Sequence, residues 1–83
     1  MGAKLFYFAR PFFERTGRLY PGEAMPFVCA RDAEDGGLLL AKMAAGVVVY
    51  QQLGDPEFDL WEEPEILAVH GAVSAKQLTE AAA

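Results

Sequence analysis

A chain of 83 residues with a formal net charge of −5 can build one hydrophobic core but not two. Its composition, 53% hydrophobic and 23% charged, is typical of a globular domain and excludes a disordered segment. The single cysteine excludes an internal disulfide, and no apolar run has the form of a secretion signal or reaches the ~20 residues of a spanning helix. We therefore expect one small, acidic domain in the cytoplasm, without a membrane segment.

Charge is distributed unevenly along the chain. Residues 1–31 contain five basic and two acidic residues, a net charge of +3, whereas residues 32–83 contain two lysines and ten carboxylates, a net charge of −8. Such a division can steer a charged partner or favour head-to-tail self-association. It predicts a protein partner, and self-association is one form of it.

The first predicted element is a strand over residues 4–9. Phe6, Tyr7 and Phe8 are aromatic residues that favour strands. Pro11 lacks an N–H group for the ladder, so the strand is expected to end at Arg10 and Pro11.

A structured loop is predicted over residues 11–25, because Thr16-Gly17 and Tyr20-Pro21-Gly22 are typical of turns. A short second strand follows over residues 26–30. The loop carries two aromatic and two basic side chains, which are Phe12, Phe13, Arg15 and Arg18.

The main helix is predicted to begin after Asp32, whose side chain can cap the first turn. Residues 38–45 are good helix formers, and Gly46 is placed to end the helix in the left-handed conformation. The alternative is a hairpin turn at residues 35–37 that leads into a strand. Helix is favoured, because two glycines cost only about 1 kcal/mol each.

Residues 47–50 give the strongest strand signal, since they are β-branched or aromatic and apolar on both faces. This strand is therefore expected in the centre of the sheet. A turn is predicted at residues 53–56, and a further strand at residues 66–69. Pro64 indicates that this last part lies at an edge or begins a strand.

Ser74 and Gln77 form a capping box, which predicts a short C-terminal helix or tail over residues 74–83. Residues 1–73 then make a single α+β domain. Its expected fold is a small, mainly antiparallel sheet of about four strands, in the order strand-strand-helix-strand-strand-helix, with the main helix packed on one face.

Catalytic residue types are scarce, since the chain has one histidine, one cysteine and one serine. Cys29 lies in an apolar run, which favours a buried structural cysteine. The alternative is a thiolate dyad with His70, which requires that their strands pair. His70 precedes Gly71 and is expected at the surface or in a turn. No catalytic residue is assigned, and an enzyme is not favoured.

The acidic segment at residues 55–65 is the densest polar cluster. Asp55, Glu57 and Asp59 resemble the opening of an EF-hand loop, but Leu60 replaces the required glycine and Ile66 the final glutamate. A solvated acidic turn is therefore expected, and no metal is assigned. No glycine-rich phosphate loop and no paired cysteine motif is present, so no cofactor is assigned.

Nucleic-acid binding is a second hypothesis. Five of the first thirteen residues are aromatic, and Arg10, Arg15 and Arg18 follow closely, which could form a stacking surface for a single strand. A net charge of −5 opposes phosphate, so nucleic acid is not the expected partner.

Trp61 lies among acids, and it is expected either to pack on the sheet or to act as a partly exposed anchor for a protein partner. We predict a non-catalytic protein–protein interaction or structural module. The alternatives are a nucleic-acid-binding domain and a small-ligand or metal-binding domain. The interaction residues predicted are Phe12, Phe13, Arg15, Arg18, Asp59, Trp61, Glu62 and Glu63.

Overall fold

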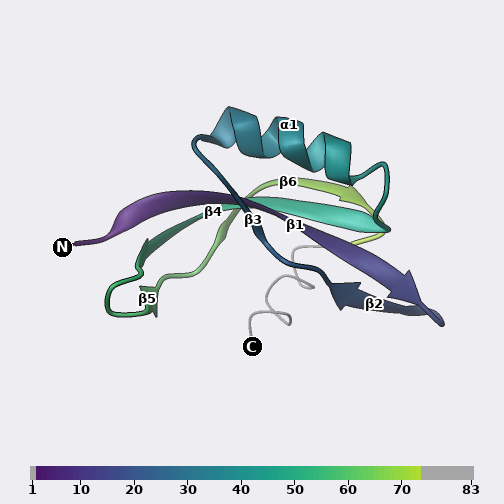
Figure 1. Cartoon of the computed structure of the whole chain (residues 1–83), viewed down its shortest axis with the longest axis horizontal. Coiled ribbons are helices and arrows are strands. Elements are labelled where there is room, and N and C mark those ends of the chain that lie inside the picture. Colours follow the sequence, from purple (N-terminus) through teal and green to yellow (C-terminus); the bar gives the residue numbers. More distant parts are fainter. Residues whose placement is uncertain (1, 74–83) are drawn as a thin grey trace.

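The computed structural model describes residues 2–73 (Figure 1), so the predicted C-terminal helix lies outside the described residues. The chain forms a small α+β fold with an antiparallel sheet and one helix on one face, as predicted. No helix within residues 2–73 has the length and hydropathy needed to cross a membrane. The elements are β1 (Lys4–Arg15), β2 (Arg18–Pro21), β3 (Met25–Phe27), α1 (Ala30–Leu40), β4 (Gly46–Asp55), β5 (Leu60–Trp61) and β6 (Glu65–Gly71).

The sheet has six strands, not the four predicted, and three of them precede the helix. β1 and β4 form its centre and pair from Lys4 with Gly54 to Phe12 with Gly46. β2 and β3 both pair with the outer side of β1, and β5 and β6 both pair with the outer side of β4. The sheet is thus four strands wide, because each outer position is divided between two short strands.

β1 continues through Pro11, where the sequence predicted its end. The Pro11 carbonyl accepts a hydrogen bond from the Gly22 N–H at 2.8 Å. In an antiparallel strand the N–H and C=O of one residue point to the same side. The nitrogen of Pro11 therefore faces the gap between β2 and β3, so its missing N–H removes no bond to β4.

The predicted loop after Pro11 is a β-hairpin. Thr16 and Gly17 connect β1 to β2, and both have positive φ angles, 49° and 78°. A two-residue turn with both φ angles positive has the right-handed twist that a hairpin needs. The turn predicted at these two residues is confirmed, but the flanking residues lie in strands.

α1 confirms the predicted helix over the hairpin alternative, but its ends differ from the prediction. It begins at Ala30 with Cys29 as N-cap, and the Cys29 side chain makes no capping bond. The predicted strand at residues 26–30 accordingly ends at Phe27. Gly46 does not end the helix in the left-handed conformation, because it already belongs to β4.

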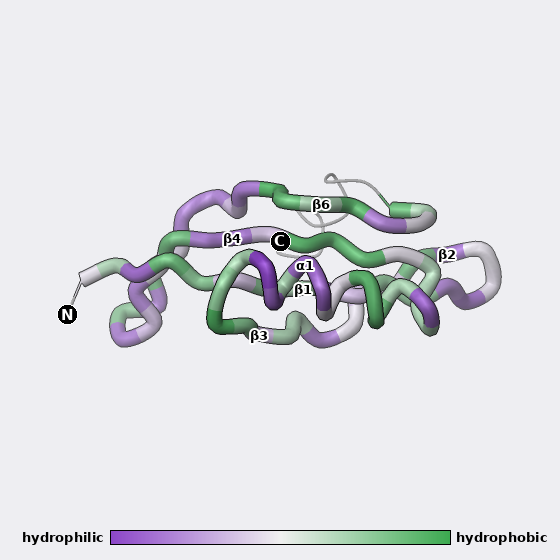
Figure 2. The backbone as a smooth tube through the Cα atoms, turned by 90° about the horizontal axis from the view of Figure 1, so that it is seen from above, coloured by the Kyte–Doolittle hydropathy of each residue, from purple (hydrophilic) through white to green (hydrophobic). Residues whose placement is uncertain are grey.

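The fully buried part of the core between α1 and the sheet is made of small side chains, and larger ones such as Tyr7 and Phe27 pack at its border. Ala9, Ala33, Val47 and Val49 are fully buried there. A Cβ atom added to Gly37 would lie 2.5 Å from Cγ2 of Val49, so the absence of a side chain lets the helix approach the sheet. The hydrophobic part of β4 lies between β1 and β6 (Figure 2), which confirms the predicted central strand.

Candidate functional site

The tip of the β1–β2 hairpin presents two pairs of side chains on one face. Phe13 pairs with Tyr20 across the strands, and Arg15 pairs with Arg18. Alternate residues of a strand share a face, so all four side chains lie together. Phe13 is 42% exposed and Tyr20 44% exposed, and both arginines are exposed. We call these four residues the hairpin surface.

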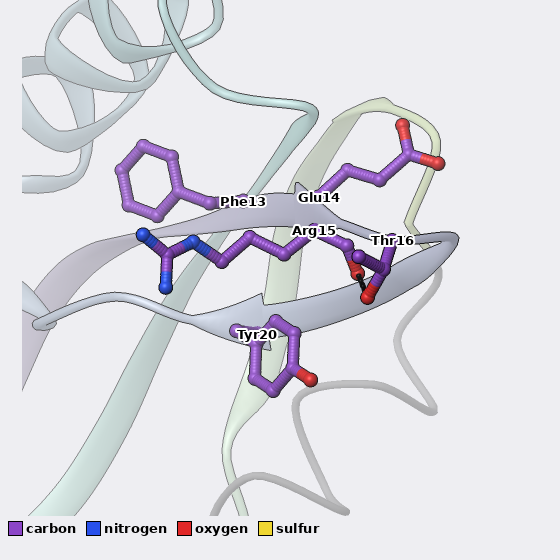
Figure 3. A pocket seen from close by; sticks show the side chains of 5 residues that line it. All are labelled: Phe13, Glu14, Arg15, Thr16 and Tyr20. Carbon is purple, nitrogen blue, oxygen red and sulfur yellow. Dashed lines mark hydrogen bonds between the residues drawn. The ribbon is translucent and has the colours of Figure 1, made fainter.

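Next to the hairpin surface lies an open depression of about 960 Å³ (Figure 3). The Arg15 side chain runs back along the hairpin between the side chains of Phe13 and Tyr20. Glu14 and Thr16 complete the lining, and all five lining residues are exposed. Ligand pockets bury most of a small molecule, so this open shape suits contact with a larger surface better than capture of a metabolite.

The two arginines of the hairpin surface oppose each other directly across the strands. Like charges at such positions destabilise a hairpin by roughly 0.2–1 kcal/mol. Neither guanidinium forms an ion pair or a side-chain hydrogen bond with any of residues 2–73. An acidic group from another molecule would relieve this repulsion.

The segment at the β4–β5 turn is acidic. Its members in the predicted site are Asp59, Trp61, Glu62 and Glu63, which we call the acidic end. Asp59 has a positive φ angle of 54°, and its Oδ1 accepts a hydrogen bond from Nε1 of Trp61 at 3.2 Å. The Glu62 N–H donates to the Leu53 carbonyl at 2.9 Å, so the backbone is held against β4.

Trp61 packs on the sheet and also stays partly exposed, so its geometry is compatible with both of the roles expected from the sequence. Its ring packs over Gly54, where an added Cβ atom would collide with the indole. The ring centroid lies 5.4 Å from that of Phe6 and 6.4 Å from that of Phe8. The side chain is nevertheless 41% exposed. Trp61 is therefore anchored on the sheet and still available to a partner.

The hairpin surface and the acidic end lie at opposite ends of the molecule (Figure 1), whose longest extent is 42 Å. Gly54 pairs with both Lys4 and Trp61, which puts the acidic end beside the start of β1. Arg15 follows Lys4 by eleven residues, or about 36 Å at 3.3 Å per residue. The structure therefore does not bring the two halves of the predicted site together.

Phe12 is the one predicted interaction residue that the structure buries, at 1% exposure. It lies on the sheet face opposite α1 and packs with Val48 and Tyr50. Phe12 alternates with Phe13 along β1, so the two neighbouring rings point to opposite faces.

Cys29 and His70 are not brought together. Cys29 is exposed, which corrects the prediction of a buried cysteine, and it lies in no strand that could pair with that of His70. The His70 ring packs near Gly37, and an added Cβ there would be 3.9 Å from Cδ2 of the ring. Gly37 lies eight residues along α1 from Cys29, or about 12 Å at 1.5 Å per residue. The geometry gives no thiolate dyad.

Two carboxylates of the acidic segment accept hydrogen bonds from groups within the same turn. Oδ1 of Asp55 accepts a hydrogen bond from the Glu57 N–H at 3.2 Å, and Asp59 accepts the bond from Trp61. Within the described part of the chain, no group of three or more His, Cys, Asp or Glu side chains is arranged to hold a metal ion.

Sequence reasoning missed Tyr20 and the pair of Arg10 with Tyr50. Tyr20 could have been found, because a Thr-Gly turn between Arg15 and Arg18 makes Phe13 and Tyr20 partners.

Arg10 Nε donates to the Gly22 carbonyl at 2.9 Å. Burial raises the pKa of Tyr50 above its usual 10.0, and Arg10 partly offsets this rise. Arg10 and Tyr50 are neighbours because of the β1–β4 register, which the sequence alone does not reveal.

Comparison of this chain with protein-family models, with curated proteins and with solved structures found no significant match.

Proposed function

We propose that this protein is a non-catalytic interaction module that binds an acidic protein surface through its hairpin surface. The observation that carries the proposal is the pairing of Arg15 with Arg18 beside Phe13 and Tyr20, all exposed on one face of the β1–β2 hairpin. Arginine and tyrosine are enriched among residues that dominate binding energy at protein interfaces.

The energetics of the hairpin support this proposal. Two arginines placed opposite each other reduce stability in the free protein, and an acidic partner would turn this repulsion into two attractions. The rings of Phe13 and Tyr20 supply apolar area that loses little conformational entropy when it is covered. The module would therefore bind with charge complementarity at the rim and aromatic contact at the centre.

Nucleic-acid binding remains the second candidate, because exposed arginines and aromatic rings also suit a single strand. The other basic residues give it less support. Lys4 lies at the far end of β1, Arg10 is bonded to the Gly22 carbonyl, and Arg31 is on α1. A small-ligand site is supported less, because the depression at the hairpin is lined by exposed residues only.

The experiment that tests the proposal is photo-crosslinking in cells that express the protein, with benzoylphenylalanine at position 20. Leu39, on the outer surface of α1 and 63% exposed, gives the control position. We expect a discrete protein adduct from position 20 that is absent from position 39 and that disappears in R15E/R18E. A nuclease-sensitive adduct would instead support nucleic-acid binding. No adduct, or equal adducts from both positions, would contradict the proposal.

A further inference from the structure

The two ends of this molecule carry surfaces that complement each other in charge and in aromatic character. The hairpin surface has two exposed rings and two arginines that form no ion pair with any of residues 2–73, and the acidic end has three carboxylates around an exposed Trp61. We infer that the acidic partner of the hairpin surface is the acidic end of a second copy of this chain, in a head-to-tail contact. This inference rests on the proposed function and names its partner.

The two surfaces cannot meet within one molecule. They are separated by about 36 Å along β1, and nine consecutive residue pairs hold β1 against β4 from Lys4 to Phe12. The Debye length is ~8 Å at physiological ionic strength, so the two ends do not even attract each other appreciably through solvent. Their complementarity can be used only between molecules.

Exposed apolar side chains surround both surfaces and would be covered by the contact. Phe58 is 64% exposed and Leu60 65% exposed, and both precede Trp61 in the segment of the acidic end. At the other end the exposed rings are those of Phe13 and Tyr20. Arginine against carboxylate, with aromatic and aliphatic groups beside it, is a combination that selects this pairing over contact between two like ends.

The size of the two ends sets the expected strength of the contact between them. The two shorter extents of the molecule are 26 and 16 Å, so an end-to-end contact covers about 400 Å² on each partner. That is about half of a standard stable interface, which makes the contact weak and dependent on concentration and salt. The contact joins two different surfaces, so a dimer keeps one free hairpin surface and one free acidic end. Assembly therefore continues beyond a dimer into chains or a ring.

The test exchanges the charges of the two ends. R15E/R18E makes both ends acidic, and E62K/E63K changes the summed charge of Asp59 and residues 62 and 63 from −3 to +1, so each variant should lose self-association. The fourfold variant R15E/R18E/E62K/E63K has the wild-type net charge with the polarity reversed, so it should associate again. Light scattering after size exclusion, across protein concentration, measures the mass, and circular dichroism checks that each variant folds.

Two variants control for net charge. R31E/K42E changes exposed residues on and after α1 and gives the same net charge of −9 as R15E/R18E. E34K/D35K changes exposed helix residues and gives the same net charge of −1 as E62K/E63K. Both controls should associate as the wild type does. We expect wild-type mass to rise past a dimer in ~0.01 M salt and to return to the monomer in ~1 M salt, where the Debye length is ~3 Å.

A disulfide-trapping experiment tests the geometry without changing charge. In a C29S background, T16C places a thiol at the hairpin tip and F58C places one at the acidic end. A mixture of the two proteins should oxidise mainly to the mixed dimer. Predominant T16C–T16C or F58C–F58C dimers would show contact between like ends and would overturn the head-to-tail arrangement.

A monomeric wild type at high concentration and low salt, or a fourfold variant that fails to regain association although it folds, would also overturn the inference. The proposed function would survive that result if position 20 still crosslinked to a different protein. If the protein neither self-associates nor forms an adduct at position 20, both the proposed function and the head-to-tail contact are contradicted.

Discussion

The two faces of the sheet are packed with different kinds of side chain. Beneath α1 the buried residues are small, such as Ala9, Ala33 and Val49, and Gly37 has no side chain at all. A helix can lie close to a sheet only where such small groups separate the two backbones. This face therefore gains its stability from close contact between elements.

The opposite face is filled by aromatic rings. The Phe8 ring centroid lies 6.4 Å from that of Phe6, in a stacked pair, and 5.3 Å from that of Tyr50, in a tilted pair. The Trp61 ring covers Gly54. Within residues 2–73 no helix lies over these rings, and each large ring covers its neighbours. The face beneath α1 therefore has no room for a larger side chain, whereas the opposite face depends on the large rings that already cover it.

The largest expected effect comes from adding volume beneath the helix. Gly37→Val places a branched side chain where even one Cβ atom would be 2.5 Å from Cγ2 of Val49. We expect a loss of about 3 kcal/mol or more in the free energy of unfolding, measured with urea. Leu39→Val, which introduces the same residue on the exposed helix surface, should cost only about 0.5 kcal/mol. Equal losses at both positions would mean that the helix does not approach the sheet this closely.

A smaller loss is expected when volume is removed from the aromatic face. Trp61→Ala removes the ring contacts with Phe6 and Phe8 and uncovers Gly54, but the side chain is already 41% exposed. We expect a loss of about 2 kcal/mol in thermal or urea unfolding. Phe58→Ala, at a residue 64% exposed, should change stability by no more than about 0.5 kcal/mol. If Phe58→Ala cost as much as Trp61→Ala, the aromatic cluster would not be the source of the effect.

The smallest effect concerns the pH dependence of the aromatic face. Burial raises the pKa of Tyr50 in the folded protein above 10.0, so the folded state holds this proton more tightly than the unfolded state. The resulting stability is present below about pH 10 and is lost as pH rises through the folded pKa. Tyr50→Phe should therefore weaken the alkaline decline in unfolding free energy. Tyr20→Phe, at an exposed residue, should leave that decline unchanged, and a decline equally steep in Tyr50→Phe would contradict the argument.

Local chemistry made several elements predictable. The β-branched run at residues 47–50 favours a buried central strand whatever surrounds it, and the structure confirms one. A helix after Asp32 was predictable because a run of helix formers outweighs the two glycines, although α1 begins at Ala30 and ends at Leu40. The turn at Thr16 and Gly17 was predictable from the residue types alone.

Other elements depended on neighbours that the sequence does not reveal. Pro11 stays within β1 only because its nitrogen faces the gap between β2 and β3. Cys29 was expected in a buried strand, but the chain leaves the sheet at Phe27 and exposes it. The candidate residues Phe12 and Phe13 were separated by strand alternation, which a loop would not have imposed.

By itself, the sequence determined the α+β class, the central strand, the main helix and the division of charge between the two halves of the chain. These depend on residue type and on short-range spacing, which act locally. Only the tertiary structure decided that the basic hairpin and the acidic turn lie at opposite ends of the molecule. The physical reason is that strand pairing joins residues far apart in sequence, and its register fixes which side chains share a surface.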